Sequence, residues 1–130
     1  MAGHLKELKV NMEDKPGALA TLAEALGKAG VNIEAISAQT AGGSGDIRIL
    51  VQDTAAARKA LEGAGVKVVG EREMTFVDLD DRPGSLASTA KKLAEQNINI
   101  DAVYVVSAAS GKKQLAIGTS DTGKARTAVR

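Results

Sequence analysis

The feature that most constrains this chain of 130 residues is an internal repeat. The tetrapeptide Asp14–Gly17 (Asp-Lys-Pro-Gly) returns as Asp81–Gly84 (Asp-Arg-Pro-Gly), and these two tetrapeptides hold the only two prolines of the chain. The same offset of 67 positions, from 14 to 81, relates many further residues. Self-similarity at a fixed spacing indicates two copies of one structural unit. The further equivalent pairs include Val10 and Val77, Leu19 and Leu86, Ala23 and Ala90, Leu26 and Leu93, Asn32 and Asn99, and Ile33 and Ile100.

The offset grows by one residue in the later part of each copy. Asp53 and Thr54 return as Asp121 and Thr122, which is an offset of 68 positions, from 53 to 121. One residue has therefore been inserted in the second copy. We expect this residue in the hairpin near Gly111, because loops tolerate added residues best.

The sequence pattern of each copy predicts the order strand, helix, strand, strand, helix. The first copy continues with a final strand. Leu8, Val10 and Met12 alternate with polar residues, as in a strand with one buried face. An apolar stripe at helical spacing follows Pro16, and Gly30 is expected to end that helix in the left-handed conformation. The later elements of the first copy are expected as strands over residues 31–40 and 47–52 with a loose hairpin at 42–45, a helix capped by Asp53 or Thr54 that runs to about Gly63, and a strand over 66–70.

This order predicts an α+β fold of the ferredoxin-like type, βαββαβ, repeated twice. In each copy an antiparallel sheet carries its helices on one face. We expect a first domain over residues 1–71 and a second, truncated domain over residues 72–130 that lacks its last strand. A missing strand leaves a sheet edge unpaired, and a partner subunit is the simplest cover. A homodimer or higher homo-oligomer is therefore expected.

Composition excludes several classes of function. With 17 basic and 16 acidic residues the formal net charge is +1, which provides no electrostatic footprint for nucleic acid or for a membrane surface. The chain has no cysteine and one histidine, His4, so we expect neither a metal site nor an assembled nucleophile and base. No secretory signal and no apolar run of about 20 residues is visible. We therefore expect a non-enzymatic, cytoplasmic protein without a cofactor.

The repeated turn is the best candidate for a binding site. A helix N-terminus presents free N–H groups and a partial positive charge, which suit a carboxylate. Gly17 and Gly84 allow close approach, while the carboxylates of Asp14 and Asp81 can accept hydrogen bonds from an ammonium group. An α-amino acid needs this combination. The alternative is that each motif is ordinary capping and turn chemistry.

The repeated turn and the residues that follow it resemble a known family. Asp-x-Pro-Gly, an apolar helix, and then Gly-Val-Asn-Ile in the first copy or Asn-Ile-Asn-Ile in the second resemble the ACT domain in tandem. The resemblance covers the first copy fully and the second copy to about Val129. It implies an amino-acid-binding regulatory module, because ACT domains of aspartokinase and phosphoglycerate dehydrogenase bind amino acids between paired domains. The regulated target implied is a separate metabolic enzyme or regulator.

In that family the ligand meets the loop after the first strand, the start of the first helix and the Asn that opens the second strand. A His that precedes the turn in serine-sensing dehydrogenases is replaced here by Met12 or Leu79, which implies a more apolar pocket. The ligand-binding positions that the resemblance implies are Asp14, Gly17, Ala18, Asn32 and Ile33 in the first copy, and Asp81, Gly84, Ser85, Asn99 and Ile100 in the second.

Two alternatives stay open from the sequence. A ligand-free oligomerisation module would use the same interface surfaces as a sensor. An acylphosphatase-like enzyme would need an anion cradle with a positioned Arg and Asn, for which Arg82 and Asn99 are the available residues.

Overall fold

The computed structural model describes residues 5–130, which fall into two compact units. We call residues 5–72 the N-terminal unit and residues 73–130 the C-terminal unit, and each is described by itself. The helices and strands follow the repeat of the sequence. The N-terminal unit contains β1 (Lys6–Glu13), α1 (Ala18–Lys28), β2 (Ala35–Ala41), β3 (Ser44–Val51), α2 (Thr54–Gly63) and most of β4 (Val68–Glu73).

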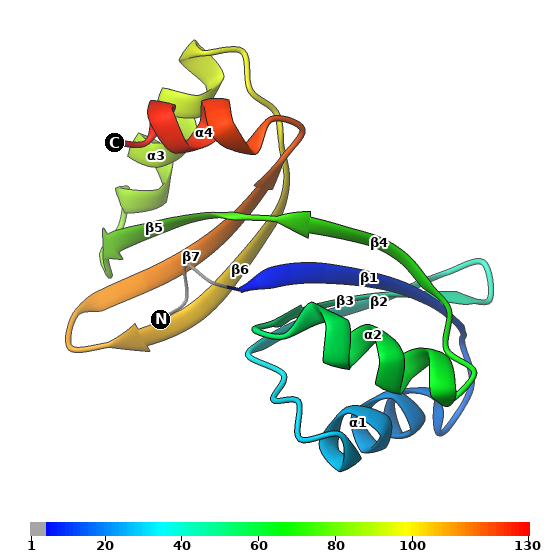
Figure 1. Ribbon diagram of the computed structural model, residues 1–130. Coiled ribbons are helices and arrows are strands. Elements are labelled where there is room, and N and C mark those ends of the chain that lie inside the picture. Colours follow the sequence, from blue (N-terminus) through cyan, green and yellow to red (C-terminus); the bar gives the residue numbers. More distant parts are fainter. Residues whose placement is uncertain (1–4) are drawn as a thin grey trace. The chain divides into compact units, whose positions relative to one another are not determined.

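The N-terminal unit has the predicted ferredoxin-like arrangement. Its four strands lie in the order β2-β3-β1-β4, and α1 and α2 cover one face of this sheet (Figure 1). In the β1–β3 register Leu8 lies opposite Ile49 and Val10 lies opposite Ile47, so their side chains share the face that the helices cover. The core on this face consists of Leu8, Val10, Leu22, Leu26, Ile47, Ile49, Val51, Ala57, Leu61 and Val66.

The C-terminal unit repeats this arrangement with one strand fewer. It contains β5 (Thr75–Asp80), α3 (Ser85–Glu95), β6 (Ile100–Ala109), β7 (Lys112–Thr119) and α4 (Thr122–Ala128). Its strands lie in the order β5-β7-β6, with α3 and α4 on one face (Figure 1). Within residues 5–130, β5 has no neighbour on the side where β4 lies beside β1 in the N-terminal unit. The prediction that the second copy lacks its last strand is confirmed for this part of the chain.

The first helix ends at Gly30 as the sequence predicts, and the first helix of the second copy ends in the same way. Gly30 has a φ of 73°, and the N–H of Val31 donates to the carbonyl of Leu26 at 2.9 Å. In the second copy Asn97 takes the place of the glycine, with a φ of 58°. The N–H of Ile98 then donates to the carbonyl of Leu93 at 2.9 Å, the same bond. Asparagine is one of the few residues that tolerates this left-handed position.

The hairpins are tighter than the sequence suggested. The loose hairpin expected at residues 42–45 is wrong, because β2 ends at Ala41 and β3 begins at Ser44. The two loop residues both have positive φ, 59° and 84°, as a type I′ turn requires. The second hairpin has the same form, with φ of 55° at Ser110 and 75° at Gly111.

The extra residue of the second copy therefore does not lie in the hairpin near Gly111, and that prediction is wrong. The register of β6 on β7 shifts at two points, between Ile100 and Ala102 and between Val105 and Ser107. β2 has no such shift in its register on β3. A strand accommodates an added residue as a β-bulge, and a bulge has no distinctive sequence.

No helix in residues 5–130 combines the length and the apolar character that crossing a membrane would require.

Candidate functional site

The two Asp-x-Pro-Gly turns have the same backbone geometry. The N–H of Asp14 donates to the carbonyl of Gly43 at 3.0 Å, and the N–H of Asp81 donates to the carbonyl of Gly111 at 2.8 Å. Each turn is therefore attached to the hairpin of its own copy. Gly17 and Gly84 follow with φ of 89° and 90°, a left-handed conformation that glycine adopts without strain.

The glycines matter because they occupy the N-cap positions of α1 and α3. Neither helix receives a hydrogen bond from a capping side chain. In contrast, Asp53 and Asp121 cap α2 and α4 by accepting from N–H groups at 3.0 Å and 2.9 Å, which confirms the predicted cap at Asp53. The carboxylates of the repeated turns thus do not serve as helix caps, and the first turns of α1 and α3 are left without a side-chain acceptor.

The two aspartates of the turns differ in their surroundings. The carboxylate of Asp81 forms an ion pair with Lys113 at 2.9 Å. Asp14 is exposed and has no ion pair within residues 5–130, while its neighbour Lys15 pairs with Glu13 at 3.3 Å. The first copy therefore offers the more available carboxylate.

The remaining predicted residues divide into exposed and packed positions. Asn32 is exposed and its amide donates to the carboxylate of Glu34, and Asn99 is exposed as well. Ile33 and Ile100 pack against the core of their own unit, so part of their role is structural.

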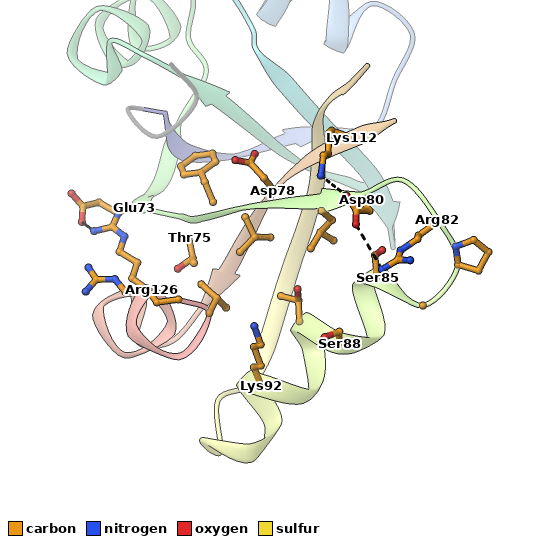
Figure 2. A pocket seen from close by; sticks show the side chains of 18 residues that line it. Glu73, Thr75, Asp78, Asp80, Arg82, Ser85, Ser88, Lys92, Lys112 and Arg126 are labelled. Atoms are coloured by element: carbon orange, nitrogen blue, oxygen red, sulfur yellow. Dashed lines mark hydrogen bonds and ion pairs between the residues drawn. The ribbon is translucent and has the colours of Figure 1, made fainter. Parts of the chain in front are cut away.

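The structure does not gather the predicted residues into one cavity. A groove of about 1090 Å³ in the C-terminal unit includes Gly84 and Ser85 in its lining, but not Asp81, Asn99 or Ile100 (Figure 2). A smaller groove between α1 and α2 of the N-terminal unit, about 340 Å³, includes none of the five positions predicted there.

Sequence reasoning missed the residues that make the larger groove polar. Its lining includes Thr75 of β5, Thr89 and Lys92 of α3, and Arg126 of α4 (Figure 2). A signal was present, because the offset of 67 aligns Thr75 with Leu8 and Thr89 with Leu22, so the two copies differ there in chemistry.

Asp80, at the end of β5, bonds to Lys112 on β7, and this interaction holds the pKa of the Asp80 carboxyl below its ordinary value. A depressed folded-state pKa means that the pair stabilises the fold above the ordinary aspartate pKa of about 4. The contribution is lost as the pH falls through the lower, folded-state pKa. We expect the pKa of Asp80, measured by NMR titration of its carboxyl carbon, to rise toward the ordinary value in Lys112→Met. The matched variant Lys124→Met should leave this pKa unchanged.

Arg82, which an acylphosphatase-like site would need, forms an ion pair with Asp80 at 3.7 Å, and its side chain is largely exposed. Within the described residues there is no group of three or more His, Asp or Glu side chains able to hold a metal ion.

The fold and the repeated turn define a class, the α+β proteins built from repeated ferredoxin-like units. Residues 6–62 match the family model described as the ACT domain. No curated protein matches the chain. Among solved structures, a protein of Bacteroides thetaiotaomicron is 25% identical, with a TM-score of 0.86 over 95% of this chain and 85% of that one.

Two further structures resemble the whole chain. The regulatory subunit of aspartate kinase from Thermus thermophilus is 20% identical, with a TM-score of 0.72 over 96% of this chain and 89% of that one. The corresponding subunit from Thermus flavus is 20% identical, with a TM-score of 0.69 over 96% and 90%. Residues 6–62 therefore match the ACT domain, and the chain as a whole resembles these regulatory subunits in fold.

Proposed function

We propose that this chain is a non-catalytic regulatory module that binds a free amino acid at an Asp-x-Pro-Gly turn. The ACT domain match over residues 6–62 and the likeness in fold to regulatory subunits of aspartate kinase support a regulatory role. Binding shifts the population of the chain toward the state that holds the amino acid better. A separate metabolic enzyme or regulator in the cytoplasm then reads that state.

The observation that carries the proposal is the left-handed glycine at the N-cap of α1. Because Gly17 has no side chain to cap the helix, the first N–H groups of α1 lack a side-chain acceptor. A ligand carboxylate satisfies them and gains from the helix dipole. The carboxylate of Asp14, in the same turn, accepts from the ligand ammonium group. Asn32, at the entry to β2, supplies a donor and an acceptor.

The first copy is the preferred site. Asp14 has no ion pair within residues 5–130, whereas Lys113 neutralises Asp81 in the second copy. We place the ligand against Asp14, Gly17, Ala18, Asn32 and Ile33, and treat Asp81, Gly84, Ser85, Asn99 and Ile100 as the weaker equivalent site.

The test is thermal unfolding of the chain across a panel of the common amino acids. An amino acid at 100 times its dissociation constant should add about 2.7 kcal/mol to the free energy of unfolding. We expect Asp14→Ala to abolish the shift and the matched variant Asp81→Ala to retain it. If no amino acid at millimolar concentration raises the melting temperature, the proposal of amino-acid binding is wrong, and ligand-free oligomerisation becomes the preferred function.

A ligand-free oligomerisation module is the second candidate, and exposed apolar side chains favour it. Leu19 on α1 and Ile36 on β2 are 49% and 44% exposed. Their counterparts Leu86 and Val103 are 46% and 45% exposed. Large apolar side chains exposed at equivalent positions of both copies are typical of an interface between domains.

We expect sedimentation velocity to give a dimer or a larger homo-oligomer that Leu19→Ser or Val103→Ser dissociates. The matched variant Val69→Ser, which also removes an exposed apolar side chain, should leave the assembly unchanged. A monomer at every concentration would exclude both oligomerisation and a ligand site shared between chains.

A further inference from the structure

The groove of the C-terminal unit lies where a fourth strand belongs. In the N-terminal unit β4 lies beside β1, and β1 corresponds to β5 by the repeat. In the C-terminal unit the groove follows β5 along its length and is bounded by α3 and α4 (Figure 2). Within residues 5–130 no strand pairs with this edge of β5, and an unpaired strand edge is a template for an extended polypeptide.

The floor of this groove is polar where the first copy is apolar. Thr75 takes the place of the core residue Leu8, and Thr89 takes the place of Leu22. Lys92, which replaces Ala25, is exposed at the groove. A site meant to hold only apolar side chains would have kept the leucines, because burying a hydroxyl without a partner costs free energy.

Thr75 is the most informative of these residues. Its side chain is only 1% exposed, and its hydroxyl makes no hydrogen bond within the described residues. The residue nevertheless forms part of the groove lining. A buried polar group without a partner calls for one, and an occupant of the groove can supply it.

The N-terminal unit indicates the chemistry of the occupant. There the carboxylate of Glu71 on β4 is held by Arg58 at 3.2 Å and by the hydroxyl of Thr54 at 3.2 Å, both on α2. A strand in the fourth position is thus anchored to the neighbouring helix through an acidic side chain.

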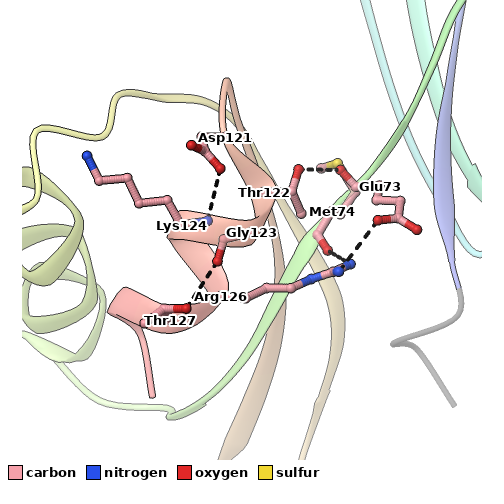
Figure 3. Close-up of polar contacts among 8 residues, drawn as sticks. All are labelled: Glu73, Met74, Asp121, Thr122, Gly123, Lys124, Arg126 and Thr127. Carbon is pink, nitrogen blue, oxygen red and sulfur yellow. Dashed lines mark hydrogen bonds and ion pairs between the residues drawn. The ribbon is translucent and has the colours of Figure 1, made fainter.

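The same two helix residues recur in the C-terminal unit as Arg126 and Thr122 on α4, but there they contact Glu73, the last residue of β4, and Met74, which precedes β5. The guanidinium of Arg126 donates to the carbonyl of Met74 at 3.1 Å and contacts the carboxylate of Glu73 at 3.5 Å (Figure 3). The Thr122 hydroxyl donates to the carbonyl of Glu73 at 3.4 Å (Figure 3). The contacts with Glu73 are exposed and weak, while the bond to Met74 is partly buried, so an arriving carboxylate competes with Glu73 for Arg126.

We propose that the groove beside β5 binds an extended strand of a partner polypeptide that carries an acidic side chain. The strand pairs its backbone with β5 and completes the sheet, as β4 does in the N-terminal unit. Its carboxylate lies among Arg126, Lys92 and the hydroxyl of Thr75. This strand site goes beyond the amino-acid site and does not depend on it.

A partner polypeptide fits this edge better than a second copy of β5. Asp78 and Asp80 alternate along the exposed part of β5, and pairing two such strands antiparallel brings carboxylates of both copies close together. Like charges at a strand pair are destabilising. A strand with a carboxylate near the Arg126 end of the groove avoids this repulsion.

The chain itself supplies a probe for the test. A capped peptide with the sequence of residues 66–73, Val-Lys-Val-Val-Gly-Glu-Arg-Glu, is titrated into the full chain while amide hydrogen exchange is followed in β5. We expect the peptide to slow exchange at residues 75–80 in a saturable manner. Replacing the glutamate that corresponds to Glu71 by lysine should weaken this binding about tenfold, as expected for loss of a charge-assisted hydrogen bond.

Variants of the chain provide the controls. Lys92→Glu and Arg126→Glu should each weaken peptide binding about tenfold. Lys91→Glu, the same charge change at a neighbouring exposed position outside the groove lining, should not. Equal protection of β5 by glutarate at the same concentration would show a site for small carboxylates and overturn the proposal. Protection of β5 that rises with chain concentration without peptide, or no protection with peptide, would also overturn it.

Discussion

Replacing Leu8 by threonine is expected to lower the free energy of unfolding by about 3–5 kcal/mol. Leu8 is fully buried in the core of the N-terminal unit, opposite Ile49 in the β1–β3 register. The change removes apolar volume from a packed site and introduces a hydroxyl with no partner in that core. Urea unfolding followed by circular dichroism measures the loss.

The reciprocal change in the second copy is expected to have the opposite sign. Thr75→Val replaces the buried hydroxyl with a methyl group of similar size and should raise the free energy of unfolding by about 1 kcal/mol, because an unpaired polar group is no longer buried. A loss of stability in Thr75→Val similar to that in Thr54→Val would contradict this interpretation of Thr75. Thr54→Val is the matched control, since it removes a hydroxyl that does have a partner, the carboxylate of Glu71.

Replacing Glu7 by alanine is expected to lower the free energy of unfolding by about 3 kcal/mol. The Glu7 side chain on β1 is 4% exposed and accepts a hydrogen bond from Nε of Arg72 on β4 at 2.8 Å. Arg48 on β3 lies 4.0 Å from its other carboxylate oxygen. Without the carboxylate, the partly buried guanidinium group of Arg72 loses a charge-assisted hydrogen bond, and Arg48 keeps only its ion pair with Asp46 at 3.7 Å among the pairs described. Equilibrium unfolding in urea provides the measurement.

Glu71→Ala is the matched control for Glu7→Ala. Glu71 also pairs with an arginine, Arg58, but both side chains are about one-third exposed, and the expected loss is below about 1 kcal/mol. In a double-mutant cycle, the variant that combines Glu7→Leu with Arg72→Leu should be more stable than the Glu7→Leu variant, because a buried pair is costly mainly when one partner is left alone. Equal losses for Glu7→Ala and Glu71→Ala would contradict the importance of burial.

Much of the fold could be predicted because most elements occur twice in the sequence, so each can be compared with its equivalent in the other copy. The prolines and glycines of the two turns, and the apolar alternation in the first strand, specify backbone geometry through local chemistry. The conformation of Gly30 and the cap at Asp53 were predicted for the same reason. Such features depend on a few neighbouring residues.

The features that were missed depend on pairing across the sheet or on burial. The bulges in β6 appear only when its register on β7 is known. Val106, which lies at the second bulge between Val105 and Ser107, is an unremarkable strand residue in sequence. Thr75 and Thr89 are ordinary in sequence. They become informative only when the structure shows that they line a groove beside β5, at the position that β4 occupies beside β1 in the other copy. The ten predicted ligand positions stay predictions, since the structure does not gather them into one cavity.

The two-residue hairpins have a consequence for the order of folding. β2 and β3 are joined by a loop of the type that closes within microseconds, so their pairing is expected to form early. β1 must then find β3 across a long stretch of chain, since Lys6 pairs with Val51. In the C-terminal unit the bulged β6 must choose among registers before β5 can join β7. We therefore expect the N-terminal unit to acquire its sheet first and the C-terminal unit to follow.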